Sequence, residues 1–164
     1  MPGIIKPQSG FTLVELVVTI LLIAILSVTV LPRLLSSTSV SSFTLRDEVI
    51  GELRKAQLMA LNNADRCYRF NATTSGYQIV HYNGRSGDLC SGTVERTDAL
   101  QDLPRGTSLT LTPNASQTFF LDFNRLGQAF WGAGSVCAGN CLQITADDTT
   151  SIAIEAQGYI HEGS

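Results

Sequence analysis

One carboxylate, Glu15, lies at the beginning of a long apolar segment. Residues 16–31 read LVVTILLIAILSVTVL and contain no Asp, Glu, Lys or Arg. A charge in such a segment costs at least about 2.5 kcal/mol near the centre of a bilayer, so it needs a positive partner. If the peptide bond after Gly10 is cut, Phe11 carries a new α-amino group, and Glu15 lies one helical turn beyond it. An amine freed in this way is the nearest positive group that the sequence offers to Glu15.

The apolar segment itself has the length of a membrane helix. Residues 11–31 number 21, about the ~20 residues that a helix needs to span a ~30 Å hydrocarbon core. Two simpler interpretations stay open, a cleaved secretory signal and a plain membrane anchor with an incidental acid. Lys6 and the apolar run would suit a secretory signal, but Glu15 would not, and no Ala-x-Ala cleavage site follows.

The N-terminal residues, to about position 33, resemble the type IV prepilins and pseudopilins. The similarity lies in the polar leader with Lys6, in Gly10-Phe11-Thr12-Leu13-Val14-Glu15-Leu16, and in Pro32 at the end of the apolar run. The resemblance implies cleavage after Gly10 by a prepilin peptidase, N-methylation of Phe11, and pairing of Glu15 with the Phe11 amine of a neighbouring subunit. It also implies a single-pass inner-membrane precursor with a periplasmic C-terminal domain, which later joins other pilin or pseudopilin subunits in a pilus or pseudopilus.

The chain then divides into four parts. These are a leader peptide (1–10), a transmembrane and filament-core helix (11–32), an amphipathic half of the same helix (33–65), and a β-rich periplasmic head (66–164). Pro32 lacks an N–H and should kink the helix. Apolar residues recur with a 3.6-residue period at Leu45, Val49, Leu53, Ala56, Met59 and Ala60, and Ile50 and Leu61 widen this stripe. We expect the stripe to pack on a sheet.

Short segments that are typical of strands, separated by turn residues, follow this helix. They cover residues 66–71, 76–82, 90–96, 107–112, 118–123, 128–131, 142–146 and 151–156, with a last candidate at 159–161. Residues 83–88 predict a turn, and residues 100–106 predict a connector. A long N-terminal helix followed by strands predicts an α+β protein in which the amphipathic half of the helix packs on an antiparallel β-sheet domain.

Two later segments refine the resemblance. Residues 120–129 (FLDFNRLGQA) look like the strand–turn–strand of the minor pilin branch that includes pseudopilin H and FimT-like proteins. Residues 151–160 (SIAIEAQGYI) look like the closing hairpin of that branch, with Gly158 suited to a positive-φ turn position. Residues 43–48 and 63–68 are also similar to minor prepilin C of mannose-sensitive haemagglutinin (MSHA) pili. The branch implies a subunit present in few copies, at a filament tip or in an initiating complex.

The four cysteines all lie beyond the apolar run, at Cys67, Cys90, Cys137 and Cys141. An oxidising periplasm would favour disulfides, and four cysteines allow three pairings. Gly and Asn between Cys137 and Cys141 can close a tight loop, so we favour that pair together with Cys67–Cys90. A zinc site made of four thiolates is the alternative, but only one pair of cysteines is closely spaced.

The remaining residues offer little sign of catalysis or of nucleic-acid binding. The net charge is −3 at pH 7, and no Lys or Arg follows Arg125, so the last part of the chain lacks a basic footprint. No His-Glu-x-x-His, Gly-x-x-x-x-Gly-Lys or Gly-x-Ser-x-Gly motif occurs. We therefore expect no enzyme, no metal, no cofactor and no nucleic-acid partner. The sequence predicts a minor type IV pilin, such as one of an MSHA pilus. The alternatives are a minor pseudopilin of a type II secretion system, and a tip adhesin or DNA-binding module.

Overall fold

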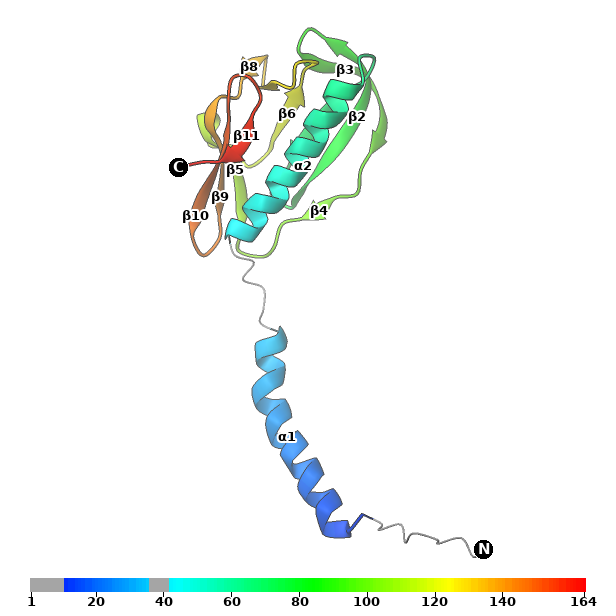
Figure 1. The fold of residues 1–164 in the computed structure, drawn as a ribbon, viewed down its shortest axis with the longest axis vertical. Coiled ribbons are helices and arrows are strands. Elements are labelled where there is room, and N and C mark those ends of the chain that lie inside the picture. Colours follow the sequence, from blue (N-terminus) through cyan, green and yellow to red (C-terminus); the bar gives the residue numbers. More distant parts are fainter. Residues whose placement is uncertain (1–10, 36–41) are drawn as a thin grey trace, which may run out of the picture. The chain divides into compact units, whose positions relative to one another are not determined.

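The computed structural model describes residues 11–35 and 42–164, with the side chains of residues 11–27 and 42–164. The chain divides into two units (Figure 1). The N-terminal unit contains helix α1 (Leu13–Leu35), and the C-terminal unit contains helix α2 (Ser42–Asn62) and every strand assigned in the described residues. The predicted leader 1–10, which includes Gly10, lies outside the described residues.

Helix α1 begins two residues later than the predicted start at Phe11. The hydroxyl of Thr12 accepts a hydrogen bond from the N–H of Glu15 at 3.2 Å. The carbonyl of Thr12 accepts one from the N–H of Leu16, also at 3.2 Å. Thr12 is therefore the N-cap, because a threonine hydroxyl can satisfy an N–H of the first turn that has no partner within the helix.

Helix α2 carries the predicted apolar stripe. Leu45, Val49, Leu53, Ala56 and Ala60 are buried, as is Ile50, and Met59 packs partly buried against the same core. The prediction for Leu61 is wrong: its side chain is 47% exposed near the end of the helix. The predicted continuity of α1 and α2 depends on residues 36–41, which lie outside the described residues, and so does the side chain of Pro32. The single helix and its kink therefore stay predictions.

The strands form two antiparallel sheets, and Figure 1 shows α2 lying across them. The first sheet has the order β3-β2-β1-β6-β7-β8, with β4 paired to β2; the second has the order β11-β10-β9-β5. The strand bounds are β1 (Cys67–Ala72), β2 (Gly76–Ser86), β3 (Leu89–Thr97), β4 (Gln101–Asp102), β5 (Ser108–Leu111), β6 (Phe119–Phe123), β7 (Ala129–Trp131), β8 (Ser135–Val136), β9 (Gly139–Thr145), β10 (Thr149–Ile154) and β11 (Ile160–Glu162). The structure is thus α+β, with a helix packed on antiparallel sheet, as the sequence predicts.

The core lies between α2 and the two sheets. Strand β1 alternates, so that Tyr68, Phe70 and Ala72 belong to this core while Arg69 lies on the other face. Leu121 and Phe123 of β6 extend the core from the first sheet, and the second sheet contributes the buried side chains Leu109, Leu111, Leu142, Ile144, Ile152, Ile154 and Ile160. One helix face therefore closes both sheets into a single hydrophobic cluster.

The predicted turn at residues 83–88 is wrong, because β2 continues through most of it. Gly84 pairs with Ser91 and Arg85 with Cys90, and the register shifts twice between His81 and Gly84. The chain reverses only at Gly87, whose φ of 65° suits glycine. Asn and Gly favour turns locally, but here pairing with β3 satisfies the backbone, and the register shifts absorb the irregular residues. The two-residue strands β4 and β8 have no counterpart among the predicted strands.

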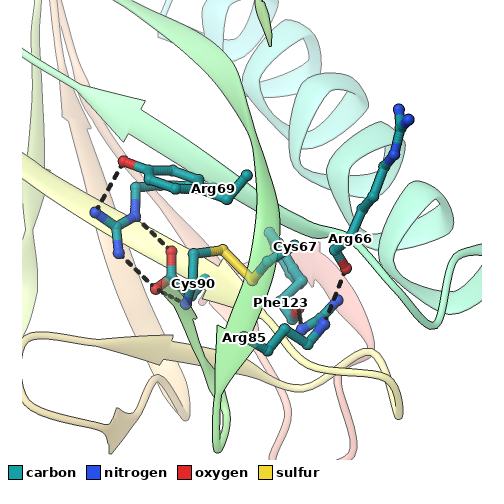
Figure 2. The surroundings of a disulfide bond; sticks show 8 residues. Arg66, Cys67, Arg69, Arg85, Cys90 and Phe123 are labelled. Atoms are coloured by element: carbon teal, nitrogen blue, oxygen red, sulfur yellow. Dashed lines mark hydrogen bonds and ion pairs between the residues drawn. A yellow bond between two sulfur atoms is a disulfide. The ribbon is translucent and has the colours of Figure 1, made fainter. Parts of the chain in front are cut away.

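Two disulfides cross-link the C-terminal unit, and they join the pairs that the sequence favours. Cys67 of β1 bonds to Cys90 of β3, with their Cα atoms 5.2 Å apart (Figure 2). Cys137 bonds to Cys141, with a Cα separation of 5.7 Å. All four sulfurs are used in these bonds.

The two disulfides should differ in their effect on stability. They enclose sequence separations of 23 and 4 residues. Loop-closure entropy then predicts a loss of about 3 kcal/mol in the free energy of unfolding when Cys67 and Cys90 are both replaced by alanine, and about 2 kcal/mol for Cys137 and Cys141. Urea denaturation of each double variant in detergent measures both losses. A larger loss for the Cys137 and Cys141 variant would contradict the expected order.

Candidate processing and assembly site

The predicted processing site falls at the beginning of α1. Phe11 precedes the first helical residue and is 77% exposed. Thr12 then caps the helix, and Glu15 follows in the first turn. The structure therefore leaves Phe11 outside the helix and accessible. Gly10, on the other side of the predicted cleavage point, lies outside the described residues.

Thr12 and Glu15 have the spacing of a capping box, Thr-x-x-Glu. In this motif the hydroxyl binds the N–H of the third helical residue, and the acid at that residue can bind the N–H of the cap. The structure contains the first of these bonds, from the Glu15 N–H to the Thr12 hydroxyl. Our sequence prediction missed this cap, although the Thr-x-x-Glu spacing before an apolar run is its ordinary signal.

The carboxylate of Glu15 is exposed and has no ion-pair partner within the described ranges. Its position in the first turn is favourable, because the N-terminus of a helix carries a partial positive charge. That effect contributes only about 0.3–1 kcal/mol, which is less than the cost of placing an unpaired charge among apolar groups. The site can therefore accept a full positive charge from outside the helix.

The exposed surface of α1 is formed mainly by its own apolar side chains. The large ones with high exposure are Leu13, Val14, Leu16, Val17, Val18, Ile20, Leu21, Leu22, Ile23, Ile25 and Leu26. A helix that is apolar around its whole circumference requires an apolar environment, either lipid or other helices. Within residues 11–35 and 42–164, no helix meets the length and hydropathy expected of a membrane span.

A second group of charged residues lies in the C-terminal unit around Asp98. Its carboxylate contacts His81 Nε2 at 3.0 Å, Arg96 Nη2 at 2.6 Å and Lys55 Nζ at 3.2 Å. Burial opposes ionisation of Asp98, but hydrogen bonds from Arg96 and Lys55 outweigh it and lower the pKa of the carboxyl group. Three cationic or protonatable groups thus hold one acid, an arrangement that fastens α2 to β2 and to the segment after β3.

The family described as "Prokaryotic N-terminal methylation motif" matches residues 5–31 of the chain. The chain carries the N-terminal methylation motif of type IV pilins and pseudopilins. The motif indicates a type IV pilin or pseudopilin that prepilin peptidase processes and that assembles with other pilins. No curated protein and no solved structure matches the chain.

The pilin-type motif contains Phe11, Thr12 and Glu15; in the structure Phe11 precedes α1, Thr12 caps it, and Glu15 lies in its first turn. The four cysteines belong instead to the C-terminal unit, where they join strands and loops. The N-methylation of Phe11 and the assembly role of Glu15 remain predictions.

Proposed function

We propose that the chain is a minor type IV pilin, a structural subunit rather than an enzyme. The observation that carries this proposal is the pilin-type motif at the head of a helix whose exposed surface is apolar, with one carboxylate in its first turn. In this proposal residues 11–31 hold the precursor in the inner membrane, with the C-terminal unit in the periplasm, and later lie in the filament core.

The apolar surface of α1 would stay out of water at both stages. Lipid covers it in the precursor, and neighbouring pilin helices cover it in the filament. Helix association in membranes depends on close packing and polar pairing, because moving an apolar helix from lipid into a helical bundle gains no hydrophobic free energy. Extraction from the membrane therefore meets no large hydrophobic barrier.

Glu15 would set the position of each new subunit. A carboxylate moved into an apolar bundle requires a cation, and the amine of a cleaved, N-methylated Phe11 on the neighbouring subunit supplies one. A helix displaced along the bundle loses this ion pair. The axial register of the subunits therefore depends on removal of the leader, because that cleavage creates the amine.

Mass spectrometry of the mature chain tests the proposal. Co-expression with a prepilin peptidase is expected to yield a chain that begins at Phe11 and carries one methyl group on its α-nitrogen. The same chain expressed without the peptidase is the control, and it should retain residues 1–10. A mature chain that keeps residues 1–10 in the presence of the peptidase, or that is trimmed beyond the apolar run, would contradict the proposal.

The minor branch, and within it the MSHA prepilin C, is supported by resemblance in residues 43–48, 63–68, 120–129 and 151–160. A minor pseudopilin of a type II secretion system fits the same motif. Deletion of the gene separates the two: loss of pili with secretion intact supports the pilin, and the reverse supports the pseudopilin.

A tip adhesin or DNA-binding module ranks behind both, because the chain is acidic overall. A gel shift at low salt tests DNA binding.

A further inference from the structure

A pocket of about 310 Å³ lies beside the turns that follow β2 and β6. It is lined by Arg85, Gly87, Asp88, Asn124, Arg125 and Leu126. Asp88 already has a partner, because its Oδ1 accepts a hydrogen bond from Asn124 Nδ2 at 2.9 Å. Two guanidinium groups and one carboxylate therefore leave the pocket with one excess positive charge.

Arg85 is held in place by the backbone. Its Nε donates to the carbonyl of Arg66 at 3.0 Å, and its Nη1 donates to the carbonyl of Phe123 (Figure 2). Its Nη2 is buried and has no hydrogen-bond partner in the described part of the chain. A buried N–H of a charged group without an acceptor is costly, so Arg85 is stabilised if an acceptor reaches this atom.

Arg125 supplies the second cation. Its side chain is exposed, and it makes no ion pair with the residues that the structure describes. Burial lowers the pKa of Arg85, and the charge of Arg125 lowers it further. Two cations that repel each other in this way are both stabilised when an anion binds between them.

We propose that this pocket binds a carboxylate group. A planar guanidinium matches a carboxylate with parallel hydrogen bonds, and arginine is the residue that favours this geometry. The single excess positive charge suits a monovalent carboxylate better than a divalent phosphate. The site goes beyond the proposed function, since it does not require the chain to enter a filament.

The carboxylate has two possible sources, a small soluble acid and the acidic turn of a second copy. Asp147 and Asp148 lie in the turn between β9 and β10, and both are exposed. β10 is six residues long, about 20 Å. Gly158, which follows the far end of β10, lies against Gly127 beside the pocket. A chain therefore cannot place this turn in its own pocket, whereas a second copy can, in a head-to-tail contact.

Nuclear magnetic resonance of the arginine side chains in the full chain, held in detergent micelles, tests the site. Sodium acetate replaces sodium chloride at constant ionic strength, and the Nε–Hε signals of Arg85 and Arg125 are followed. Both signals are expected to shift with a millimolar dissociation constant. Arg125→Gln should weaken binding about tenfold or more, because it removes a charged hydrogen-bond donor.

Arg105→Gln is the matched control, since Arg105 is an exposed arginine away from the pocket. It removes the same charge and should leave acetate binding unchanged. An absent shift, an equal loss in the Arg105 and Arg125 variants, or a preference for phosphate over acetate would overturn the proposal. The Arg125 variant keeps the backbone contacts of Arg85, so its fold can be checked by the unchanged backbone spectrum.

A second titration distinguishes the two sources. Unlabelled parent chain is added to labelled chain, and the same two arginine signals are followed. A shift that disappears when the unlabelled chain carries both Asp147→Asn and Asp148→Asn assigns the carboxylate to the turn of a second copy. Binding of acetate without any effect of added chain assigns the site to a small soluble acid.

Discussion

Replacement of Glu15 by alanine is expected to prevent incorporation of the chain into filaments, while cleavage of the leader and the fold of the C-terminal unit stay unchanged. Removing one partner of an ion pair in an apolar environment costs about 3–5 kcal/mol. At about 1.4 kcal/mol for each factor of ten, incorporation should fall at least about 100-fold. Immunoblots of sheared filaments measure incorporation, and the mass of the cell-associated chain reports cleavage.

Glu15 also lies in the first turn of a capped helix, so its charge must be separated from its part in the cap. Glutamine can fill the capping-box position but cannot pair as an anion. Glu15→Gln should therefore fail to assemble much as alanine does, whereas Glu15→Asp should assemble in part. Thr12→Val removes the observed cap hydroxyl and leaves the carboxylate. Its cost is about 1 kcal/mol of helix stability, and its filaments should form. Normal assembly of Glu15→Gln would refute the ion-pair role.

The sequence predicts the helical parts of this protein well because their signals are local. The period of the α2 stripe identifies five of its buried apolar residues, Leu45, Val49, Leu53, Ala56 and Ala60. Leu61 is exposed because it lies at the edge of the stripe, whereas its neighbour Ala60 is fully buried. The Thr12-x-x-Glu15 cap is also a local signal, since the two residues lie three positions apart at the beginning of the apolar run.

Strands are harder to predict from the sequence where their pairing partners lie far away along the chain. Asn83 and Gly84 are typical turn residues, yet Gly84 pairs with Ser91 of β3 and the Asn83 side chain bonds Thr93 of β3, so both residues lie in strand β2. The pocket beside Arg85 and Arg125 is hard to predict from the sequence for the same reason. Arg85 binds the carbonyl of Phe123, 38 residues away, and no periodicity connects the two. Periodic patterns in the sequence predict which face of a helix or strand a residue occupies. A contact between distant segments, such as that from Arg85 to Phe123, depends instead on which strands become neighbours in the sheet.

Replacement of Asp122 by asparagine is expected to produce the largest loss of stability in the C-terminal unit. Asp122 is 0% exposed. Its two carboxylate oxygens accept hydrogen bonds from Arg69 Nε at 2.6 Å and Nη2 at 2.8 Å, and one of them also accepts the N–H of Cys90 at 2.8 Å (Figure 2). The Arg69 guanidinium lies between rings, 3.9 Å from the centroid of Phe120 and 4.9 Å from that of Tyr82.

Asparagine keeps the shape of Asp122 but leaves Arg69 with an unpaired, largely buried charge. The expected loss is about 3–5 kcal/mol in the free energy of unfolding. Typical domains have only about 5–15 kcal/mol in total, so the variant should be partly unfolded near physiological temperature. Urea denaturation of the oxidised full chain in detergent, followed by far-ultraviolet circular dichroism, measures this loss.

Arg66→Gln is the matched control because it breaks an exposed ion pair, in which Arg66 Nε lies 3.3 Å from Glu95 Oε2. Solvent screens such a pair, and its loss should cost less than about 1 kcal/mol. The double variant Arg69→Met with Asp122→Leu removes both charges at once, and it should be more stable than Asp122→Asn alone because no buried charge is left unpaired. Equal losses for Asp122→Asn and Arg66→Gln would mean that the buried pair contributes no more than a surface contact. A double variant less stable than Asp122→Asn would instead assign the loss to two contacts that it removes, the packing of the Arg69 guanidinium between Phe120 and Tyr82 and the hydrogen bond that Asp122 accepts from the Cys90 N–H.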